Sequence, residues 1–305
     1  MKGENEIWKK LLKAEKKARS GKFIKLSRAP LLYPSLMVFN YILYPVFKRG
    51  IYGKANTFFD IPMRTLLPSG TDIMLNGIKS HDSEIRLTKY LARELHEGDI
   101  FIDVGAHYGY YSLLASALVG TTGKVYSIEA SVSSLDNLQE NVSPYKNIQT
   151  FHAAAGDAPG TITFYEYPGP YAEYNTIVAG AYANEKWYST VKEKKNEVPI
   201  LILDNLIKTE GIEKAFIKID VEGGESSVLR GLHTSLKEKQ LTIAMEYLLP
   251  KTKIGLHQEA AGMLYDDGYK SYGITLDGNL APVTNIDGYL LEKKMNSDNI
   301  VFLKN

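Results

Sequence analysis

The sequence predicts an α/β fold in which helices cover both faces of a mostly parallel sheet. Apolar runs at residues 101–104, 216–219 and 241–246 are as long as strands and show no strict polar alternation. This pattern is typical of parallel strands that are buried on both faces. Segments with helical periodicity separate the runs, and no internal repeat interrupts them, as expected for successive βαβ units.

The composition excludes several classes of protein. The 305 residues are 44% hydrophobic and 23% charged, which is ordinary for a globular chain. Residues 1–30 carry ten Lys or Arg against three Glu, a net charge of +7, so the total of +1 leaves −6 for the remaining chain. An acidic body argues against a nucleic-acid partner. The absence of cysteine excludes disulfides, thiolate zinc sites and cysteine nucleophiles.

Residues 1–74 are expected to form an N-terminal extension that precedes a second domain at 75–305. The extension comprises a basic helix at 5–20, an apolar segment at 29–47 and a β-hairpin within 57–78. Pro30, Pro34 and Pro45 argue against a membrane-spanning helix. Two interpretations stay open, a helical cap packed on the second domain and a peripheral membrane contact through residues 1–50. Without a secretory signal, the expected location is cytoplasmic, free or membrane-associated.

The remaining elements follow in chain order. The expected helices are 83–95, 110–119, 131–141, 225–237 and 256–267, and the expected strands are 100–104, 124–128, 148–152, 198–203, 216–219 and 241–246, with a hairpin near 161–165. Strands at 269–275 and 299–303 are expected to pair as an antiparallel edge.

The turn after the first strand of the second domain is the most informative segment. Asp103 ends the strand, and Gly105 and Gly109 follow in a Gly-x-x-x-Gly spacing that leads into a helix. Open α/β sheets bind ligands at such carboxyl ends, and glycine permits tight turns and close approach. The spacing differs from the Gly-x-Gly-x-x-Gly of dinucleotide-binding folds.

A second acidic residue narrows the ligand. Glu129 ends the next strand, where nucleoside-binding folds place a carboxylate on the ribose hydroxyls. A solvated acid at a strand end would also explain it. Together the two sites favour an adenosyl ligand, and the missing dinucleotide pattern favours S-adenosylmethionine over NAD.

Three segments resemble the FkbM family of S-adenosylmethionine-dependent methyltransferases. They are the turn at 103–112, the Ala-Ala-Ala-Gly-Asp segment at 153–157 and the Asp-Val-Glu-Gly-Gly-Glu segment at 220–225, and the resemblance covers residues 75–305. It implies a class I methyltransferase (Rossmann-like) fold, a seven-stranded sheet whose last strand is inserted antiparallel. It also implies a cofactor site made by Asp103, Gly105, Ala106, His107, Gly109, Glu129 and Ala130, with Asp157 near the adenine. The family commonly has Asn at the position of His107, and His, unlike Asn, can also titrate.

Methyl transfer to a hydroxyl requires a group that accepts the hydroxyl proton. The candidate catalytic bases are Asp220, Glu222, His81 and Glu84, with Glu246 as a further carboxylate. Asp220 and Glu222 follow a buried strand into a loop at the sheet's ligand-binding edge, although helix capping would also explain them. Asp220 and Glu246 are the candidate ligands of a divalent cation, but no diagnostic spacing establishes one.

The tyrosine-rich segment at 165–188 is expected to form a lid over the acceptor, although a packed loop would explain the same residues. The leading hypothesis is O-methylation of a carbohydrate or other small hydroxylated metabolite. The alternatives are a NAD-dependent oxidoreductase and a non-catalytic, membrane-peripheral binding protein with a degenerate cofactor pocket.

Overall fold

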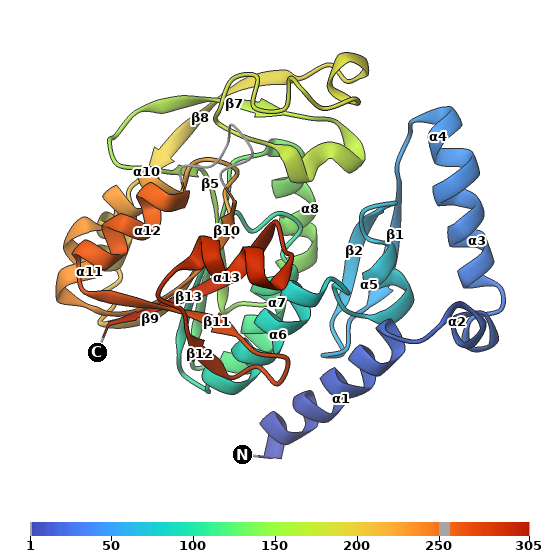
Figure 1. Ribbon diagram of the computed structural model, residues 1–305, viewed down its shortest axis with the longest axis horizontal. Helices are drawn as coiled ribbons and strands as arrows, with labels where there is room; N and C mark the ends of the chain where they lie inside the picture. The colour runs from blue at the N-terminus through green and yellow to red at the C-terminus, as the bar shows by residue number, and fades with distance from the viewer. Residues whose placement is uncertain (1, 250–256, 305) are drawn as a thin grey trace.

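The fold centres on one large twisted sheet, and its computed structural model describes residues 2–249 and 257–304 (Figure 1). Neighbouring strands follow the order β12 (Leu280–Pro282), β11 (Tyr269–Ile274), β13 (Ser297–Lys304), β10 (Gln240–Leu248), β9 (Lys214–Ile219), β3 (Ile100–Val104), β4 (Lys124–Glu129) and β5 (Ile148–His152). The five strands from β10 to β5 are mutually parallel. β13 is antiparallel to both of its neighbours.

This topology confirms the predicted class I methyltransferase fold and corrects one detail. β13 and β11 pair antiparallel as expected, and β13, the last strand, is inserted between β10 and β11 as the family resemblance implied. The sheet has eight strands instead of seven, because the three-residue β12 adds a short hairpin to β11. β12 and the helix α13 (Ile286–Lys293) were not predicted.

Helices cover both faces of the sheet, and each strand supplies alternate residues to two separate cores. Phe101 packs with one core and Ile102 with the other, and the same alternation holds for Phe216 and Ile217. The first core is closed by α1 (Lys2–Ala18), α6 (Asp82–Glu94), α7 (Tyr110–Val119) and α8 (Val132–Val142), and the second by α9 (Leu203–Thr209), α10 (Glu225–Arg230), α11 (His233–Glu238), α12 (His257–Asp266) and α13.

The helix predicted at 225–237 is two helices, α10 and α11. The break lies at Gly231, where a Cβ would stand 2.1 Å from the carbonyl oxygen of Gly156. This close backbone approach, which the sequence pattern does not reveal, requires glycine at the break. The helix predicted at 256–267 is α12, and its expected first residue, Leu256, lies outside the described residues.

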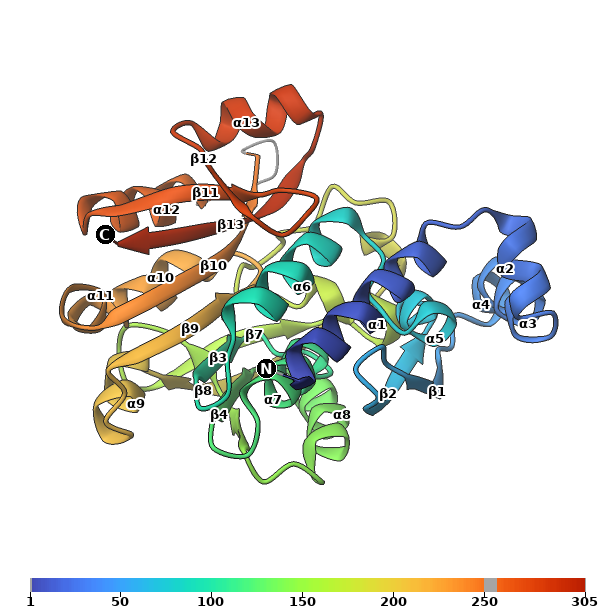
Figure 2. The ribbon, with the colours of Figure 1, turned by 90° about the horizontal axis from the view of Figure 1, so that it is seen from below.

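The N-terminal extension comprises α1, α2 (Lys22–Arg28), α3 (Leu32–Val38), the π-helix η1 (Phe39–Leu43), α4 (Tyr44–Phe47), the hairpin β1 (Ile51–Asn56) and β2 (Pro62–Leu67), and α5 (Thr71–Asn76). The hairpin begins earlier than predicted, and the segment expected to be its second half is α5. α1 lies along α6 (Figure 2), with Leu11 fully buried and Glu15 paired with Lys89 at 2.7 Å. The basic helix is therefore part of the packed structure.

A small sheet orders β6 (Ala154–Ala155), β8 (Lys194–Leu201) and β7 (Thr161–Glu166), and β7 pairs with β8 in antiparallel register. The tyrosine-rich segment connects these two strands. It contains the 3₁₀ helices η2 (Gly169–Tyr174) and η3 (Tyr188–Thr190), and Thr176 bridges back to Tyr165. The hairpin expected near 161–165 therefore consists of β7 and β8. The tyrosine-rich segment is the long connection between these two strands.

Candidate functional site

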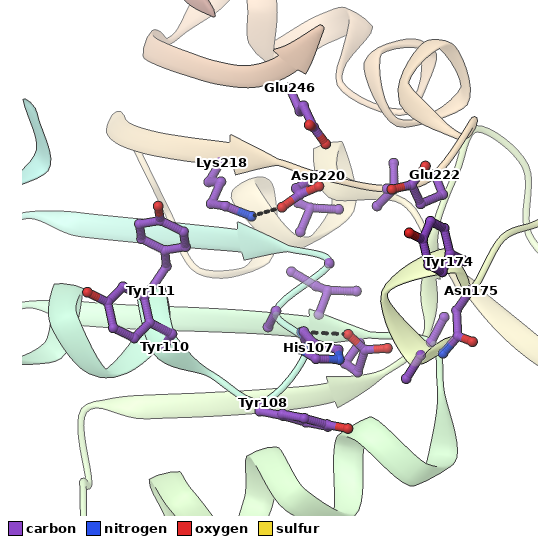
Figure 3. Close-up of a pocket in the computed structure, with 18 of the residues that line it drawn as sticks. His107, Tyr108, Tyr110, Tyr111, Tyr174, Asn175, Lys218, Asp220, Glu222 and Glu246 are labelled. Carbon is purple, nitrogen blue, oxygen red and sulfur yellow. Dashed lines mark hydrogen bonds and ion pairs between the residues drawn. The ribbon is translucent and has the colours of Figure 1, made fainter. Parts of the chain in front are cut away.

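A cavity of about 450 Å³ lies at the carboxyl ends of the parallel strands (Figure 3). Its lining includes the turn after β3, the end of β4, the end of β9 with its following loop, Glu246 of β10, residues 153–155 with Phe164, and a wall from outside the large sheet. That outer wall comes from the N-terminal extension, from residues 79–84 and from the tyrosine-rich segment. The placement matches the position where open α/β sheets bind ligands.

The turn after β3 is held by backbone geometry. Gly105 adopts a φ of 80°, and a Cβ there would lie 1.9 Å from the carbonyl oxygen of Asp220. The amides of Gly105 and Ala106 both donate to the carbonyl oxygen of Ile128 at 3.0 Å. The turn therefore requires glycine because it packs against the loop after β9. This requirement holds whether or not the glycine also contacts a ligand.

Glu129 ties the end of β4 to this turn. Its carboxylate accepts the backbone N–H of His107 at 2.7 Å and that of Ser131 at 2.8 Å. Burial raises the pKa of Glu129 to about 7, although these two hydrogen bonds oppose the shift. The side chain lines the cavity and is not the solvated acid of the alternative interpretation.

His107 lies on the cavity wall with a φ of 51°, a left-handed conformation in which Asn and His are enriched. This conformation is compatible with the His present here and with the Asn that the family resemblance leads one to expect. Burial first, and then the charge of Lys79, lower the pKa of His107 to about 3, so its ring is neutral at physiological pH. Within the described part of the chain its Nε2 has no hydrogen-bond partner. The titrating role left open by the sequence is therefore disfavoured, and a hydrogen bond to a ligand is favoured.

Three predicted cofactor contacts do not line the cavity. Asp103 is buried behind the turn, where Ser112 donates to it at 2.7 Å, and Gly109 supports the packing of α7 on Leu138. Asp157 points away, because Arg230 binds its carboxylate at 2.6 Å on the surface. Gly105, Ala106, His107, Glu129 and Ala130 do line it.

A charged cluster from β9 and β10 faces the other end of the cavity (Figure 3). Lys218 is buried and donates to Asp220 at 2.8 Å. Burial opposes ionisation of Asp220, but Lys218 and Lys79 outweigh it and lower its pKa to about 2. Burial and the charge of Asp220 raise the pKa of Glu246 well above its usual range, which favours a protonated Glu246 beside an ionised Asp220.

Residues 79–84 complete this wall. Lys79 pairs with Glu84 at 3.2 Å, and Tyr111 donates its hydroxyl to the same carboxylate at 2.5 Å. The ammonium groups of Lys79 and Lys218 each lie 5.2 Å from the centre of the Tyr111 ring. His81 also lines the cavity, and its Nδ1 lies 2.7 Å from the hydroxyl of Ser83. The predicted His81 and Glu84 therefore line the same cavity as Asp220.

Glu222 is tied to the tyrosine-rich segment. Tyr182 donates to its carboxylate at 2.8 Å, and Thr176 donates to its carbonyl oxygen at 2.5 Å. Most aromatic rings of the segment pack on one another, as Tyr171 does by stacking on Trp187 at 4.7 Å. Of its predicted tyrosines and tryptophan, Tyr174 lines the cavity. The segment thus forms a cavity wall, with a packed aromatic cluster as its support.

Lys79 and Lys218 were not among the predicted site residues. Lys218 interrupts the apolar run of β9, and a lysine inside a buried strand is rarely tolerated without a partner. That signal identifies it from the sequence alone. Lys79 lies in an ordinary loop, and its role depends on packing from a distant element.

The proposed metal ligands lie together, but Lys218 and Lys79 already place positive charge beside Asp220. Among residues 2–249 and 257–304, no group of three or more His, Asp or Glu side chains is arranged to hold a metal ion. On this wall, Lys218 and Lys79 therefore balance the negative charge of the Asp220–Glu246 pair.

Comparisons with known proteins identify similar chains. A curated relative is a probable cobalt-precorrin-6B C(15)-methyltransferase (decarboxylating) of Sulfurisphaera tokodaii, 26% identical over 176 residues that span 55% of this chain and 88% of the relative. Among solved structures, an FkbM methyltransferase from Methylobacillus flagellatus is 14% identical, with coverage of 74% of this chain and 56% of that chain and a TM-score of 0.42. Aeropyrum pernix fibrillarin with bound S-adenosyl-L-methionine is also 14% identical, with coverage of 71% and 73% and a TM-score of 0.36.

The family model described as methyltransferase FkbM domain matches residues 103–271. The match begins at Asp103, near the end of β3, and includes the turn, Glu129 and the loop after β9. It covers more than half of the 305 residues. The chain therefore belongs to the FkbM family of methyltransferases.

Proposed function

We propose that the chain transfers a methyl group from S-adenosylmethionine to a hydroxyl of a carbohydrate or another small hydroxylated metabolite. The observation that carries this proposal is the cavity itself. One of its walls, with Glu129 and His107, suits an adenosyl group, and the other holds Asp220 beside Lys79 and Lys218. The family assignment disfavours both alternatives, a NAD-dependent oxidoreductase and a non-catalytic binding protein.

The cofactor wall suits an adenosyl group. Glu129 lies at the strand end from which a carboxylate accepts ribose hydroxyls, and its oxygens keep lone pairs beyond the two amide hydrogen bonds. Three alanines at 153–155 and Phe164 give a flat apolar surface for an adenine, and His107 offers a buried nitrogen. When bound, S-adenosylmethionine supplies a methyl group that its positive sulfonium makes electrophilic.

The charged wall suits a polar acceptor. Asp220 is ionised across the physiological pH range and can accept a hydrogen bond from an acceptor hydroxyl. A hydroxyl proton becomes strongly acidic as its oxygen forms the new bond to carbon, so even a weak base can receive it. Lys79 and Lys218 stabilise the charge of Asp220, while Glu84 and Glu222 can bind further hydroxyls. A sugar-like molecule carries several neighbouring hydroxyls that could bind these carboxylates. The net negative charge of the chain after residue 30 disfavours a nucleic acid.

Asp220→Asn tests this assignment. We expect the rate of methyl transfer to fall by about 10²–10⁴-fold, because the amide cannot take the proton. The affinity for S-adenosylhomocysteine should change less than a few-fold. The rate is followed with labelled S-adenosylmethionine on a panel of sugars, glycosides, small hydroxylated metabolites and RNA, and the affinity by titration calorimetry.

The matched control is Asp136→Asn, an exposed aspartate on α8. Its rate and affinity should equal those of the unmodified chain. An unchanged rate in Asp220→Asn would move the proton acceptor to another residue. Binding of NAD without binding of S-adenosylhomocysteine, or methylation of RNA alone, would overturn the proposed function.

A further inference from the structure

The outer part of the N-terminal extension exposes an unusual amount of apolar surface. The helices α2 to α4 form the rim of the molecule farthest from α10–α12 (Figure 1). Phe23 is 89% exposed, Leu31 83%, Tyr41 77%, and both Val46 and Phe47 are 70% exposed. Scattered single apolar residues are normal on a surface, whereas a contiguous group marks an interaction site.

This surface is fixed in place by its inner side. Leu36 and Phe39 are buried against Leu67, and Asn40 donates to Thr71 at 2.9 Å. Arg28 donates to the side chain of Asn76 at 2.9 Å. The helices α2–α4 therefore pack on the hairpin and α5 with one side and present the other side outward. We call the outward side of residues 22–52 the rim surface.

The charge of the surrounding segment is of one sign. No Asp or Glu occurs between Glu15 and Asp60. The same stretch carries Lys16, Lys17, Arg19, Lys22, Lys25, Arg28, Lys48, Arg49 and Lys54. Apolar side chains flanked by exposed Lys and Arg are the pattern of a peripheral membrane segment, in which the rings enter the headgroup region and the cations bind anionic lipids.

A groove on this rim fits the same partner. It has a volume of about 180 Å³ and is lined by Phe39, Leu43, Phe47 and Ile51, with Arg49 beside them. An apolar groove next to a guanidinium suits an acyl chain and its phosphate. In the part of the chain that the structure describes, no helix is long and apolar enough to cross a bilayer.

A second copy of the chain fits this surface poorly. A two-fold interface places the same patch on both partners, so it would bring two cationic, acid-free faces together. Such like-charge juxtaposition is unfavourable across an interface, whereas an anionic bilayer complements it. The positive charge of this surface therefore favours an anionic lipid bilayer over a second copy of the chain as its partner.

We propose that the rim surface docks the protein peripherally on an anionic lipid bilayer. The same extension lines one wall of the cavity through Met63, Thr65 and Ile73. Tyr44, in α4, also hydrogen-bonds to Tyr171 of the tyrosine-rich segment. The inference is independent of which hydroxyl the enzyme methylates.

The test is sedimentation of the full chain with vesicles of phosphatidylcholine alone and of phosphatidylcholine with phosphatidylglycerol. We expect binding to the anionic vesicles, weakened by added salt because the lysines and arginines contribute electrostatically. The double variant Val46→Ser with Phe47→Ser should lower the partition coefficient roughly tenfold or more, since two exposed apolar groups are lost. Lys48→Glu with Arg49→Glu should lower it as well.

Matched controls lie on the opposite part of the molecule. Leu276→Ser with Leu291→Ser removes two other exposed apolar side chains, and Lys208→Glu with Lys270→Glu reverses two other exposed charges. Both controls should sediment like the unmodified chain, and all variants should retain their melting temperature and their binding of S-adenosylhomocysteine. Absence of binding to anionic vesicles, or equal losses in the controls, would overturn the proposal. So would a dimer in analytical ultracentrifugation that the rim variants dissociate.

Discussion

The two walls of the cavity are built in different ways. The turn after β3 is a local structure, in which Gly105, His107 and Glu129 are held by backbone hydrogen bonds and by left-handed conformations. The opposite wall is assembled from side chains that are far apart in the sequence, as in the contacts of Tyr111 with Glu84 and of Tyr182 with Glu222.

This difference predicts that the two walls respond differently to substitution. A turn fixed by glycine and by main-chain amides tolerates few substitutions, because backbone geometry leaves few alternatives. A wall of side chains on three separate segments can change one residue at a time. We therefore expect substitutions in the turn to affect folding and cofactor binding together, and substitutions in the opposite wall to affect acceptor use alone.

Gly105→Ala is expected to have the largest effect. The new methyl group would meet the carbonyl oxygen of Asp220 at 1.9 Å, in a backbone conformation that alanine rarely adopts. Strain and overpacking together should lower the free energy of unfolding by about 2–6 kcal/mol and abolish binding of S-adenosylhomocysteine. Urea denaturation and titration calorimetry measure the two effects.

Gly262→Ala is the matched control. This glycine lies within α12, and a Cβ there meets nothing within 4 Å. Alanine is the better helix former, so the control should gain up to about 1 kcal/mol of stability. Equal behaviour of the two variants would show that the turn is not constrained by its contact with Asp220.

Glu129 should make cofactor affinity depend on pH. Its pKa is about 7, so it is largely protonated below that pH, whereas ribose hydroxyls bind best to the ionised carboxylate. Binding thus favours loss of a proton, and affinity for S-adenosylhomocysteine should fall as the pH falls below about 7, approaching tenfold per pH unit. Calorimetry across this range should show no such slope for Glu129→Gln, while the exposed Glu238→Gln should keep it. A slope that survives in Glu129→Gln would assign the pH dependence to another group.

Sequence reasoning succeeded where function depends on local order along the chain. The strand that ends at Asp103, the two glycines and the acid at Glu129 are separated by short, regular spacings, so the sheet and the cofactor turn followed from them. It was less successful for side chains whose position depends on tertiary packing. Asp157 turns to Arg230 on the surface, and Lys79 lies over the ring of Tyr111 and near the charge of Asp220, both distant in the sequence.

Tyr174→Ala should have the smallest effect, and it examines the opposite wall directly. The ring lines the cavity from the tyrosine-rich segment, so its loss removes a flat surface against which an acceptor ring packs. We expect KM for the acceptor to rise about three- to tenfold while the affinity for S-adenosylhomocysteine stays constant. Tyr188→Ala is the control, because Tyr188 belongs to the same aromatic cluster but does not line the cavity. A similar rise in KM for both variants would mean that the cluster acts only as a support, and unequal losses of cofactor affinity would contradict the separation of the two walls.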